Sequence, residues 1–527
     1  MTEFARIDTH VSPPRIELPR AFNAAVDLVE RNLAEGRGGN LAYADAGGRH
    51  SHAELAERVN RAGSALLALG LQAEQRIVLC LADSIDFPTV FLGAIKAGLL
   101  PVPVNPAMTP ADLGFVLADS RAPALVISDA FLPAVADSLR RQRHLRHVIV
   151  AGVAKAGETA LSALLAAASD RLVPADTTAD DAAFWLYSSG STGQPKGVVH
   201  RHADMLWTAA LYGQAVLGLR PDDVVFSAAK LFFAYGLGNA LSFPLSVGAS
   251  AALLAERPTP EAVARMFEMH RPSVFCAVPT LYAALLADDQ LRPGAATARL
   301  RLCLSAGEAL PEEIGRRWRR RFGVDILDGL GSTELLHIFL SNRPGEVRYG
   351  SSGRPVPGYE VKLLAESGEA VPGGEIGDLW VSGPSSASCY WNNRQKSLDT
   401  FVGAWTRTGD KYRQDADGYY VYAGRSDDML KVGGIWVSPF EVESTLLAHD
   451  KVLEAAVVGQ ADEARLIKPK AYVVLKPGVA PAEALAEELR GFVKDRLAPY
   501  KYPRWIEFVA ELPKTTTGKI QRYKLRI

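Results

Sequence analysis

The chain has 527 residues, of which 48% are hydrophobic. A chain of this length can bury several hydrophobic cores, so two or more domains are expected. Lysine and arginine together number 58 and aspartate and glutamate 59, which leaves a formal net charge of −1. This balance creates no overall field that would gather nucleic acid or anionic lipid, so neither partner is expected.

The cysteines and the N-terminal residues favour a reducing, cytoplasmic location. Residues 1–20 contain acidic residues and prolines and no apolar core, so a secretory signal is not expected. No apolar run reaches the roughly 18 residues that a membrane-spanning helix needs. Four cysteines lie far apart, without the CxxC spacing of a zinc or disulfide framework. They are Cys80, Cys276, Cys303 and Cys389.

Helical and strand patterns alternate in the first part of the chain, from about residue 41 to 172. This alternation is typical of parallel sheets covered by helices. It resumes over residues 222–254 and 273–326, so α/β layers are expected as far as about Gly350. In the first part, helices are predicted at Ser51–Leu69, Ser84–Ala97 and Thr109–Asp119, and strands at Arg76–Cys80, Ala124–Ser128 and Val148–Val150.

Beyond about Gly350 the pattern changes twice. Up to about Tyr422, short strands separated by glycine- and proline-rich turns predict a β-rich subdomain, with strands at Val361–Leu363, Gly377–Val381 and Gly418–Tyr422. From about Asp428 an opening turn and helix precede two strands, a helix and a strand, which predicts a small α+β unit. These four elements are expected at Val452–Val458, Lys470–Leu475, Ala482–Leu497 and Arg504–Phe508.

The most informative motif is the run from Tyr187 to Gly197, YSSGSTGQPKG, which follows a predicted strand. Glycines let backbone N–H groups approach phosphate oxygens, hydroxyls add donors, and Lys196 supplies a positive charge. The run is not a Walker A loop, because Lys196 follows Pro195 and no serine or threonine follows the lysine. A polyphosphate-binding loop of another kind is therefore predicted.

This loop resembles the phosphate-binding signature of the adenylate-forming enzymes, which include acyl-CoA synthetases, peptide-synthetase adenylation domains and beetle luciferases. Other signatures of that superfamily follow in order, so the resemblance covers the chain from about Leu41 to its end. They are Ser305–Glu308 for adenine, Asp328–Glu334 for the glutamate that holds magnesium, Thr408–Asp410 with Gly424–Arg425 for ribose, and Pro513–Arg522 for the catalytic lysine.

The chemistry of such enzymes explains these residue types. A carboxylate is a poor electrophile, so it first attacks the α-phosphorus of ATP, which brings two anions together and calls for positive charge. By resemblance Lys519, Glu334 and Thr192 are catalytic, and Glu334 holds Mg²⁺. The implied ATP-binding residues are Ser188, Ser189, Gly190, Ser191, Thr192, Gly193, Lys196, Ala306, Gly307, Glu308, Asp328, Gly329, Leu330, Gly331, Ser332, Thr333, Asp410, Arg425 and Lys519.

Two positions depart from the superfamily pattern. Leu330 stands where many members carry an aromatic residue, which replaces ring stacking on adenine by apolar contact. Phe233 stands where many members carry a histidine, so it can gate the approach of the carboxylate without donating a hydrogen bond.

The resemblance also implies a second half-reaction with coenzyme A. Residues 1–426 would form a large N-terminal domain of layered α/β sheets plus the β-rich subdomain, and residues 427–527 a small mobile α+β domain that turns about Asp427 after adenylation. Lys431, Gly433 and Gly434 would contact CoA, because glycine lets the thiol arm pass close to backbone. The chain ends soon after Lys519, so free CoA is expected as the acceptor.

Within the superfamily the sequence is most similar to bacterial benzoate-CoA ligases, in the stretches KLFFAYGLGN (residues 230–239) and GSTELLHIFLSN (residues 331–342). Rings and an imidazole around a small apolar slot suit a flat aromatic acid and exclude a long flexible chain. The residues that would line this aryl pocket are Ala234, Tyr235, Phe243, Ala306, Gly331, His337 and Ile338.

The expected reaction is ATP plus benzoate, or a close aromatic acid, plus CoA giving aroyl-CoA, AMP and pyrophosphate. Other readings stay open: a ligase for hydroxybenzoate, aminobenzoate or a short or medium aliphatic acid, or an adenylation enzyme that loads a carrier protein. Two alternatives belong to other classes of protein. One is a catalytically silent acyl-adenylate sensor, which would not need Lys519, and the other is a light-emitting oxidase. A homodimer, and control through a lysine acyltransferase and deacylase acting on Lys519, are further expectations from the resemblance.

Overall fold

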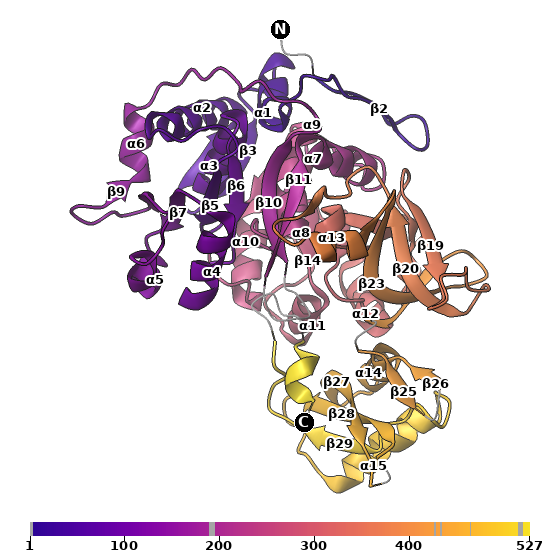
Figure 1. Ribbon diagram of the computed structural model, residues 1–527. Helices are drawn as coiled ribbons and strands as arrows, with labels where there is room; N and C mark the ends of the chain where they lie inside the picture. The colour runs from indigo at the N-terminus through magenta and orange to yellow at the C-terminus, as the bar shows by residue number, and fades with distance from the viewer. Residues whose placement is uncertain are drawn as a thin grey trace.

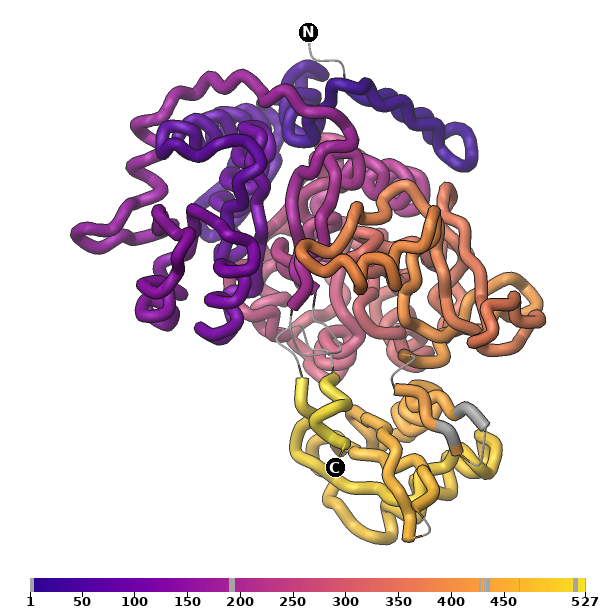
Figure 2. Tube along the Cα trace, viewed as in Figure 1, coloured from indigo at the N-terminus to yellow at the C-terminus, as the bar shows by residue number. Residues whose placement is uncertain are grey.

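The structure is a computed structural model that describes residues 4–188, 195–425, 428–432, 435–463, 465–514 and 520–526. A large lobe contains the chain up to Arg425, and the part from Asp428 onward forms a small lobe at one end of it (Figures 1 and 2). No helix of the described residues is both long and apolar enough to cross a membrane.

The first sheet of the large lobe is parallel and covered on both faces. Its strand order is β6-β5-β7-β8-β9, and its residues alternate between two cores. Ile77 and Leu79 face the core that includes α2, α3 and α6, whereas Val78 and Cys80 face the core of α4 and α5. The strands are β5 (Arg76–Cys80), β6 (Leu100–Pro103), β7 (Ala124–Ser128), β8 (His147–Ala151) and β9 (Thr159–Ala160), and the helices α2 (His52–Ala68), α3 (Asp86–Lys96), α4 (Pro110–Ser120), α5 (Leu132–Leu139) and α6 (Leu161–Ala167).

A second, larger sheet is parallel through its centre, in the order β16-β15-β14-β12-β13-β3, with antiparallel β17, β18 and β4 at its edges. Val274 and Phe275, neighbours on β14, pack into different cores, so this sheet too is buried on both faces. Its strands are β3 (Leu41–Asp45), β4 (Gly48–Ser51), β12 (Val224–Ser227), β13 (Ser250–Ala252), β14 (Val274–Ala277), β15 (Leu302–Ser305), β16 (Ile326–Gly331), β17 (Ile338–Ser341) and β18 (Arg354–Pro355). The helices α10 (Pro260–His270), α11 (Pro279–Ala287) and α12 (Glu312–Phe322) contribute to the core on one face.

The antiparallel hairpin of β10 (Ala182–Ser188) and β11 (Lys196–Arg201) runs through the centre of the large lobe (Figure 1). On β10, Phe184 and Leu186 join one core of the first sheet while Trp185 joins the other. The short strand β21 (Cys389–Tyr390) pairs with β11 from a distant part of the chain. Residues far apart in sequence therefore meet at this hairpin.

Several further helices, from different parts of the chain, complete the large lobe. They are α1 (Ala24–Ala34), α7 (His202–Thr208), the π-helix η1 (Ala209–Gln214), α8 (Ala234–Leu237), the π-helix η2 (Gly238–Ser242), α9 (Phe243–Val247), the 3₁₀ turn η3 (Thr333–Leu335) and α13 (Arg394–Thr400). The remaining strands there are the pair β1 (Arg6–Asp8) and β2 (Arg15–Glu17), and the β-rich sheet of β19 (Glu360–Leu364), β20 (Ile376–Ser382), β22 (Phe401–Val402), β23 (Trp405–Gln414) and β24 (Tyr420–Arg425).

The small lobe has its own hydrophobic core, formed among others by Val442, Val457, Val473 and Leu489. Its main sheet has the order β27-β28-β29. The elements are β25 (Leu430–Val432), β26 (Ile435–Val437), α14 (Pro439–Leu447), β27 (Val452–Ala461), β28 (Ile467–Leu475), α15 (Glu483–Lys494), β29 (Trp505–Phe508) and the 3₁₀ turn η4 (Arg522–Leu525). The predicted α/β layers, β-rich subdomain and C-terminal α+β unit are thus all present.

Candidate active site

Asp410 and Arg425, predicted to bind ribose, form an ion pair. They lie opposite each other on β23 and β24, and Nη1 of Arg425 donates to Oδ1 of Asp410 at 3.0 Å. Asp410 is buried, and its negative charge raises the pKa of Arg425. Gly409 precedes it with φ +76°, a left-handed conformation that favours glycine. Because a carboxylate accepts several hydrogen bonds, Asp410 can still receive hydroxyl donors.

Lys196 and Glu334 both contact Tyr390. The hydroxyl of Tyr390 donates to Oε1 of Glu334 at 2.8 Å, and Nζ of Lys196 lies 4.5 Å from the centroid of the Tyr390 ring. Burial lowers the pKa of Lys196, and the charge of Glu334 opposes that effect. The lysine of the predicted phosphate loop and the predicted magnesium ligand are therefore close to each other.

The ends of the predicted phosphate loop are also fixed side by side. Ser188 ends β10 and lies opposite Lys196, which begins β11. The Oγ atom of Ser188 is buried and has no hydrogen-bond partner within the described residues. Six predicted loop residues lie outside the described part of the chain: Ser189, Gly190, Ser191, Thr192, Gly193 and Gln194.

The predicted adenine segment and the predicted magnesium segment begin on neighbouring parallel strands, β15 and β16. Ser305 on β15 lies opposite Asp328 on β16, so the residues that follow them meet at the carboxyl edge of the sheet, where α/β proteins bind ligands. Ala306, Asp328 and Gly329 are buried, and burial raises the pKa of Asp328. The other predicted residues there are more accessible. They are Gly307, Glu308, Leu330, Gly331, Ser332 and Thr333.

The small lobe contacts this edge through Ile520, whose backbone N–H donates to Oε1 of Glu308 at 2.9 Å. The rings of Tyr422 and Phe440 form a second contact near the junction, with centroids 5.4 Å apart. Ile520 directly follows Lys519, which lies outside the described residues. Ile520, the residue after the predicted catalytic lysine, is therefore held against the predicted adenine segment.

His337 is the centre of the predicted aryl cluster. The centroid of its ring lies 4.5 Å from that of Phe243 and 5.6 Å from that of Tyr235, and its Nε2 donates to the carbonyl of Tyr235 at 3.2 Å. Burial lowers the pKa of His337 to about 3, so the ring is neutral. A Cβ at Gly238 would lie 2.3 Å from its Cδ2. The ring therefore fits only beside a glycine.

The other predicted aryl residues surround this cluster. A Cβ at Gly331 would lie 2.7 Å from the carbonyl oxygen of His337, and Ile338 is buried beside it. Ala234 is half-buried at the start of α8. Phe233, which precedes it, packs on Phe232 with ring centroids 4.2 Å apart.

Some predicted residues of the second half-reaction and the hinge cannot be placed. Asp427, Gly433 and Gly434 lie outside the described residues, and only the backbone of Lys431 is described, in β25. A cavity of about 920 Å³ opens elsewhere, lined among others by Arg201, Trp207 and Phe401, and it includes none of the predicted site residues.

Magnesium fits the side chains that surround Glu334. Among the described residues, no group of three or more histidine, cysteine, aspartate or glutamate side chains is placed to hold a metal ion. Mg²⁺ commonly binds one or two carboxylates together with substrate phosphates and water, without an all-protein cage. Glu334 supplies one such carboxylate, close to Lys196 of the predicted phosphate loop.

Sequence reasoning missed Tyr390 and His200, the latter bonded to Thr333. Neither belongs to a motif that binds phosphate by itself. Only the pairing of β21 with β11 reveals the neighbours of Tyr390.

The comparisons with known proteins agree with this geometry. The model of the AMP-binding enzyme family matches residues 30–391, and that of the AMP-binding enzyme C-terminal domain matches residues 441–519. The chain belongs to the family of AMP-binding enzymes.

Two known enzymes and one crystal structure are similar to this chain along nearly its whole length. The chain is 59% identical to the benzoate–CoA ligase of Thauera aromatica, over 98% of both chains. It is 51% identical to the 4-hydroxybenzoate–CoA/benzoate–CoA ligase of Rhodopseudomonas palustris, over 96% of this chain and 94% of that one. The crystal structure of a benzoate CoA ligase from Burkholderia xenovorans LB400 superposes with a TM-score of 0.90 at 54% identity, over 96% of this chain and all of that one.

Proposed function

We propose that this enzyme joins benzoate to coenzyme A at the expense of ATP. In the first step a carboxylate oxygen of benzoate attacks the α-phosphorus, which forms benzoyl-adenylate and releases pyrophosphate. In the second step the thiol of CoA attacks the acyl carbon, loses its proton and displaces AMP. The observation that carries the proposal is the 59% identity to a benzoate–CoA ligase along almost the whole of both chains.

The described residues support the first step. Asp410 and Arg425, which are paired, would bind the ribose, and Lys196 would contact phosphate oxygens. Glu334 would hold Mg²⁺, which would offset negative charge on the phosphates. Lys519 would contribute the charge at the reacting centre, with its neighbour Ile520 fixed to Glu308.

For the second step we propose that the small lobe, residues 427–527, turns about Asp427 relative to residues 1–426. This rotation would withdraw Lys519 and bring Lys431, Gly433 and Gly434 to the thiol arm of CoA. The separate core of the small lobe supports such a rigid-body motion. The catalytic role of Thr192 in the phosphate loop also stays a proposal.

The cellular setting follows from the same proposal. All four cysteines are free, which supports a cytoplasmic location. A homodimer, and acylation of Lys519 by a lysine acyltransferase with reversal by a deacylase, are proposed from the superfamily resemblance alone. Acylation would remove the charge that the first step needs.

The test of the proposed function is the identity of the product. Purified enzyme with ATP, MgCl₂, benzoate and CoA is expected to form benzoyl-CoA and AMP in equal amounts, as measured by mass spectrometry and nucleotide chromatography. If benzoyl-adenylate accumulates and free CoA does not accelerate AMP release, the enzyme loads a carrier protein instead. If no adenylate forms with any aromatic or aliphatic acid, the chain is a binding protein.

Replacement of His337 by alanine is expected to widen the acid pocket. Removal of a tightly packed ring leaves space next to Tyr235 and Phe243, so rates with para-substituted benzoates should rise roughly tenfold relative to benzoate. The measurement is kcat/KM for benzoate, 4-fluorobenzoate, 4-methylbenzoate and 4-hydroxybenzoate. The control is Tyr212→Phe. The ring of Tyr212 also lies near His337, with centroids 5.6 Å apart, and this substitution removes only its hydroxyl, so every ring of the cluster stays in place. Unchanged relative rates across the series would place His337 outside the pocket.

A further inference from the structure

The backbone that carries Glu334 is held at three consecutive carbonyl groups. Each of these carbonyl oxygens accepts a hydrogen bond from another segment of the large lobe, at 2.8 Å in every case. The donors are Nε2 of His200 for Thr333, the N–H of Ala387 for Glu334, and the hydroxyl of Ser385 for Leu335. Only the first donor is an imidazole, and it comes from β11, the strand that begins with Lys196.

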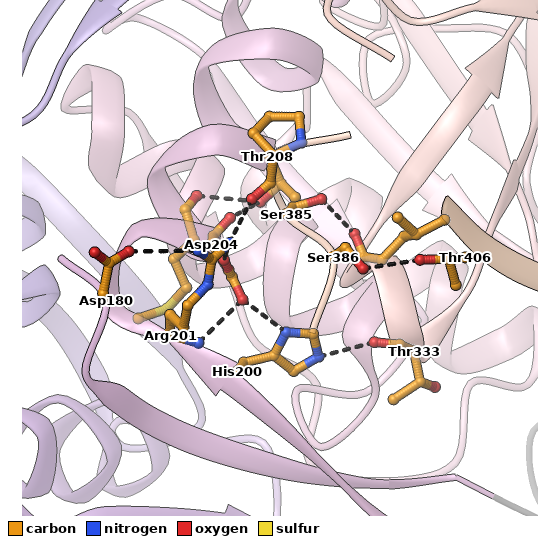
Figure 3. A network of polar contacts seen from close by, with 12 residues as sticks. Asp180, His200, Arg201, Asp204, Thr208, Thr333, Ser385, Ser386 and Thr406 are labelled. Atoms are coloured by element: carbon orange, nitrogen blue, oxygen red, sulfur yellow. Dashed lines mark hydrogen bonds and ion pairs between the residues drawn. The ribbon is translucent and has the colours of Figure 1, made fainter. Parts of the chain in front are cut away.

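His200 is oriented from both ends of its ring, as Figure 3 shows. Nδ1 lies 3.1 Å from Oδ2 of Asp204, and Nε2 lies 2.8 Å from the carbonyl oxygen of Thr333. A carbonyl oxygen only accepts hydrogen bonds, so Nε2 donates to Thr333, while Nδ1 lies against the carboxylate of Asp204. The ring also stacks on Phe184, with centroids 5.2 Å apart and an interplanar angle of 20°. Packing and hydrogen bonds therefore allow it a single orientation.

Asp204 is a fixed anchor for this ring. Its side chain is completely buried, and it also accepts hydrogen bonds from the backbone N–H and from Nη2 of Arg201, at 3.0 and 2.9 Å. A buried charge that is fully paired resists displacement. A carboxylate that orients an imidazole, which in turn fixes a functional group, is a common arrangement around metal sites.

We propose that His200 is a positioning residue for Glu334. Its Nε2–H bond to Thr333 fixes the adjoining turn, so that the Glu334 carboxylate stays beside Lys196, where ATP and its magnesium ion would bind. This inference rests on the proposed function for the identity of the nucleotide. The His200 side chain is completely buried, so the proposed effect is transmitted through the Thr333 carbonyl.

Two substitutions separate the two bonds of the ring. The amide nitrogen of glutamine takes the place of Nε2, so His200→Gln keeps a donor for Thr333. The amide nitrogen of asparagine takes the place of Nδ1, so His200→Asn keeps the donor for Asp204 and loses the bond to Thr333. The control is His202→Asn, in which an amide oxygen replaces the Nδ1 that accepts from the N–H of Ala24. His202 is equally buried but has no bond to the Glu334 turn.

The readout is ATP binding by calorimetry without any acid, once with MgCl₂ and once with EDTA. His200→Asn is expected to reduce the gain in ATP affinity that magnesium gives by roughly tenfold, as is typical when a residue behind a metal ligand is lost. His200→Gln and His202→Asn should stay close to the wild type. Thioester formation from pre-made benzoyl-adenylate and CoA should be unchanged in all three, which also measures the folded fraction.

Equal losses in His200→Asn and His200→Gln would overturn the proposal, as would a loss of ATP affinity that is the same with EDTA as with MgCl₂. Either result would mean that the ring only fills space. Failure of the proposed function would give a result that differs from failure of the His200 proposal. The wild type would then show no benzoate-dependent exchange of pyrophosphate into ATP, while the binding measurement would still decide the role of His200.

Discussion

Replacement of Lys519 by alanine is expected to slow benzoyl-adenylate formation about a hundredfold or more. The attacking carboxylate and the α-phosphate are both anions, so loss of the one positive charge proposed between them raises the barrier of this step. Thioester formation from pre-made benzoyl-adenylate should be unchanged, because Lys519 would be withdrawn during that step. The measurement is benzoate-dependent pyrophosphate exchange for the first step and benzoyl-CoA release from added adenylate for the second.

The matched control is Lys514→Ala. Lys514 lies five residues before Lys519 in sequence, and its Nζ is paired with Glu454 within the small lobe at 2.5 Å. Loss of that partly exposed pair should affect both half-reactions little and to the same extent. If Lys519→Ala slowed both half-reactions equally, the account of two conformations would be wrong.

Replacement of Glu334 by glutamine is expected to lower adenylation by about a hundredfold. The amide keeps the size of the side chain and can still accept from the hydroxyl of Tyr390, but it loses the negative charge that faces Lys196. Higher magnesium concentrations should restore part of the rate. The measurement is the rate of pyrophosphate exchange over a series of MgCl₂ concentrations.

Tyr390→Phe is the complementary variant, because it removes the hydrogen bond and keeps the charge of Glu334. Because the carboxylate keeps the charge that would hold magnesium, a decrease smaller than that of Glu334→Gln is expected. Should Glu334→Gln adenylate as fast as the wild type at low magnesium, Glu334 would not be the magnesium ligand.

The secondary structure could be predicted where local signals are strong. The helix predicted at Ser51–Leu69 is α2, whose N-terminus has a capping box between Ser51 and Glu54. The strand predicted at Arg76–Cys80 has the bounds of β5, because a strand covered on both faces is a short apolar run. Such elements need only information that lies within a few residues.

The candidate site could be predicted only in part. The superfamily motifs supplied Asp410 and Arg425, which do pair, and Lys196 and Glu334, which lie close together. The residues that hold these groups in place come from long-range pairing. Tyr390 reaches Glu334 because β21 joins β11, and His200 reaches Thr333 across the same hairpin. The spacing of residues along the sequence does not indicate such long-range contacts.

The aryl pocket was the hardest part to predict, because its residues have ordinary roles in other proteins. A buried tyrosine, phenylalanine or histidine is usually part of a hydrophobic core. The structure brings Tyr235, Phe243 and His337 into one ring cluster beside Gly238, which supports the proposed pocket.

The most direct test of the central claim is CoA-dependent AMP formation, measured in parallel with benzoate, hydroxybenzoates, aminobenzoates and hexanoate. The proposed aryl pocket around His337 would hold a flat ring better than a flexible chain, so kcat/KM for benzoate is expected to exceed that for hexanoate by about a hundredfold. Turnover of hexanoate equal to or better than that of benzoate would contradict the proposed aryl pocket and the substrate.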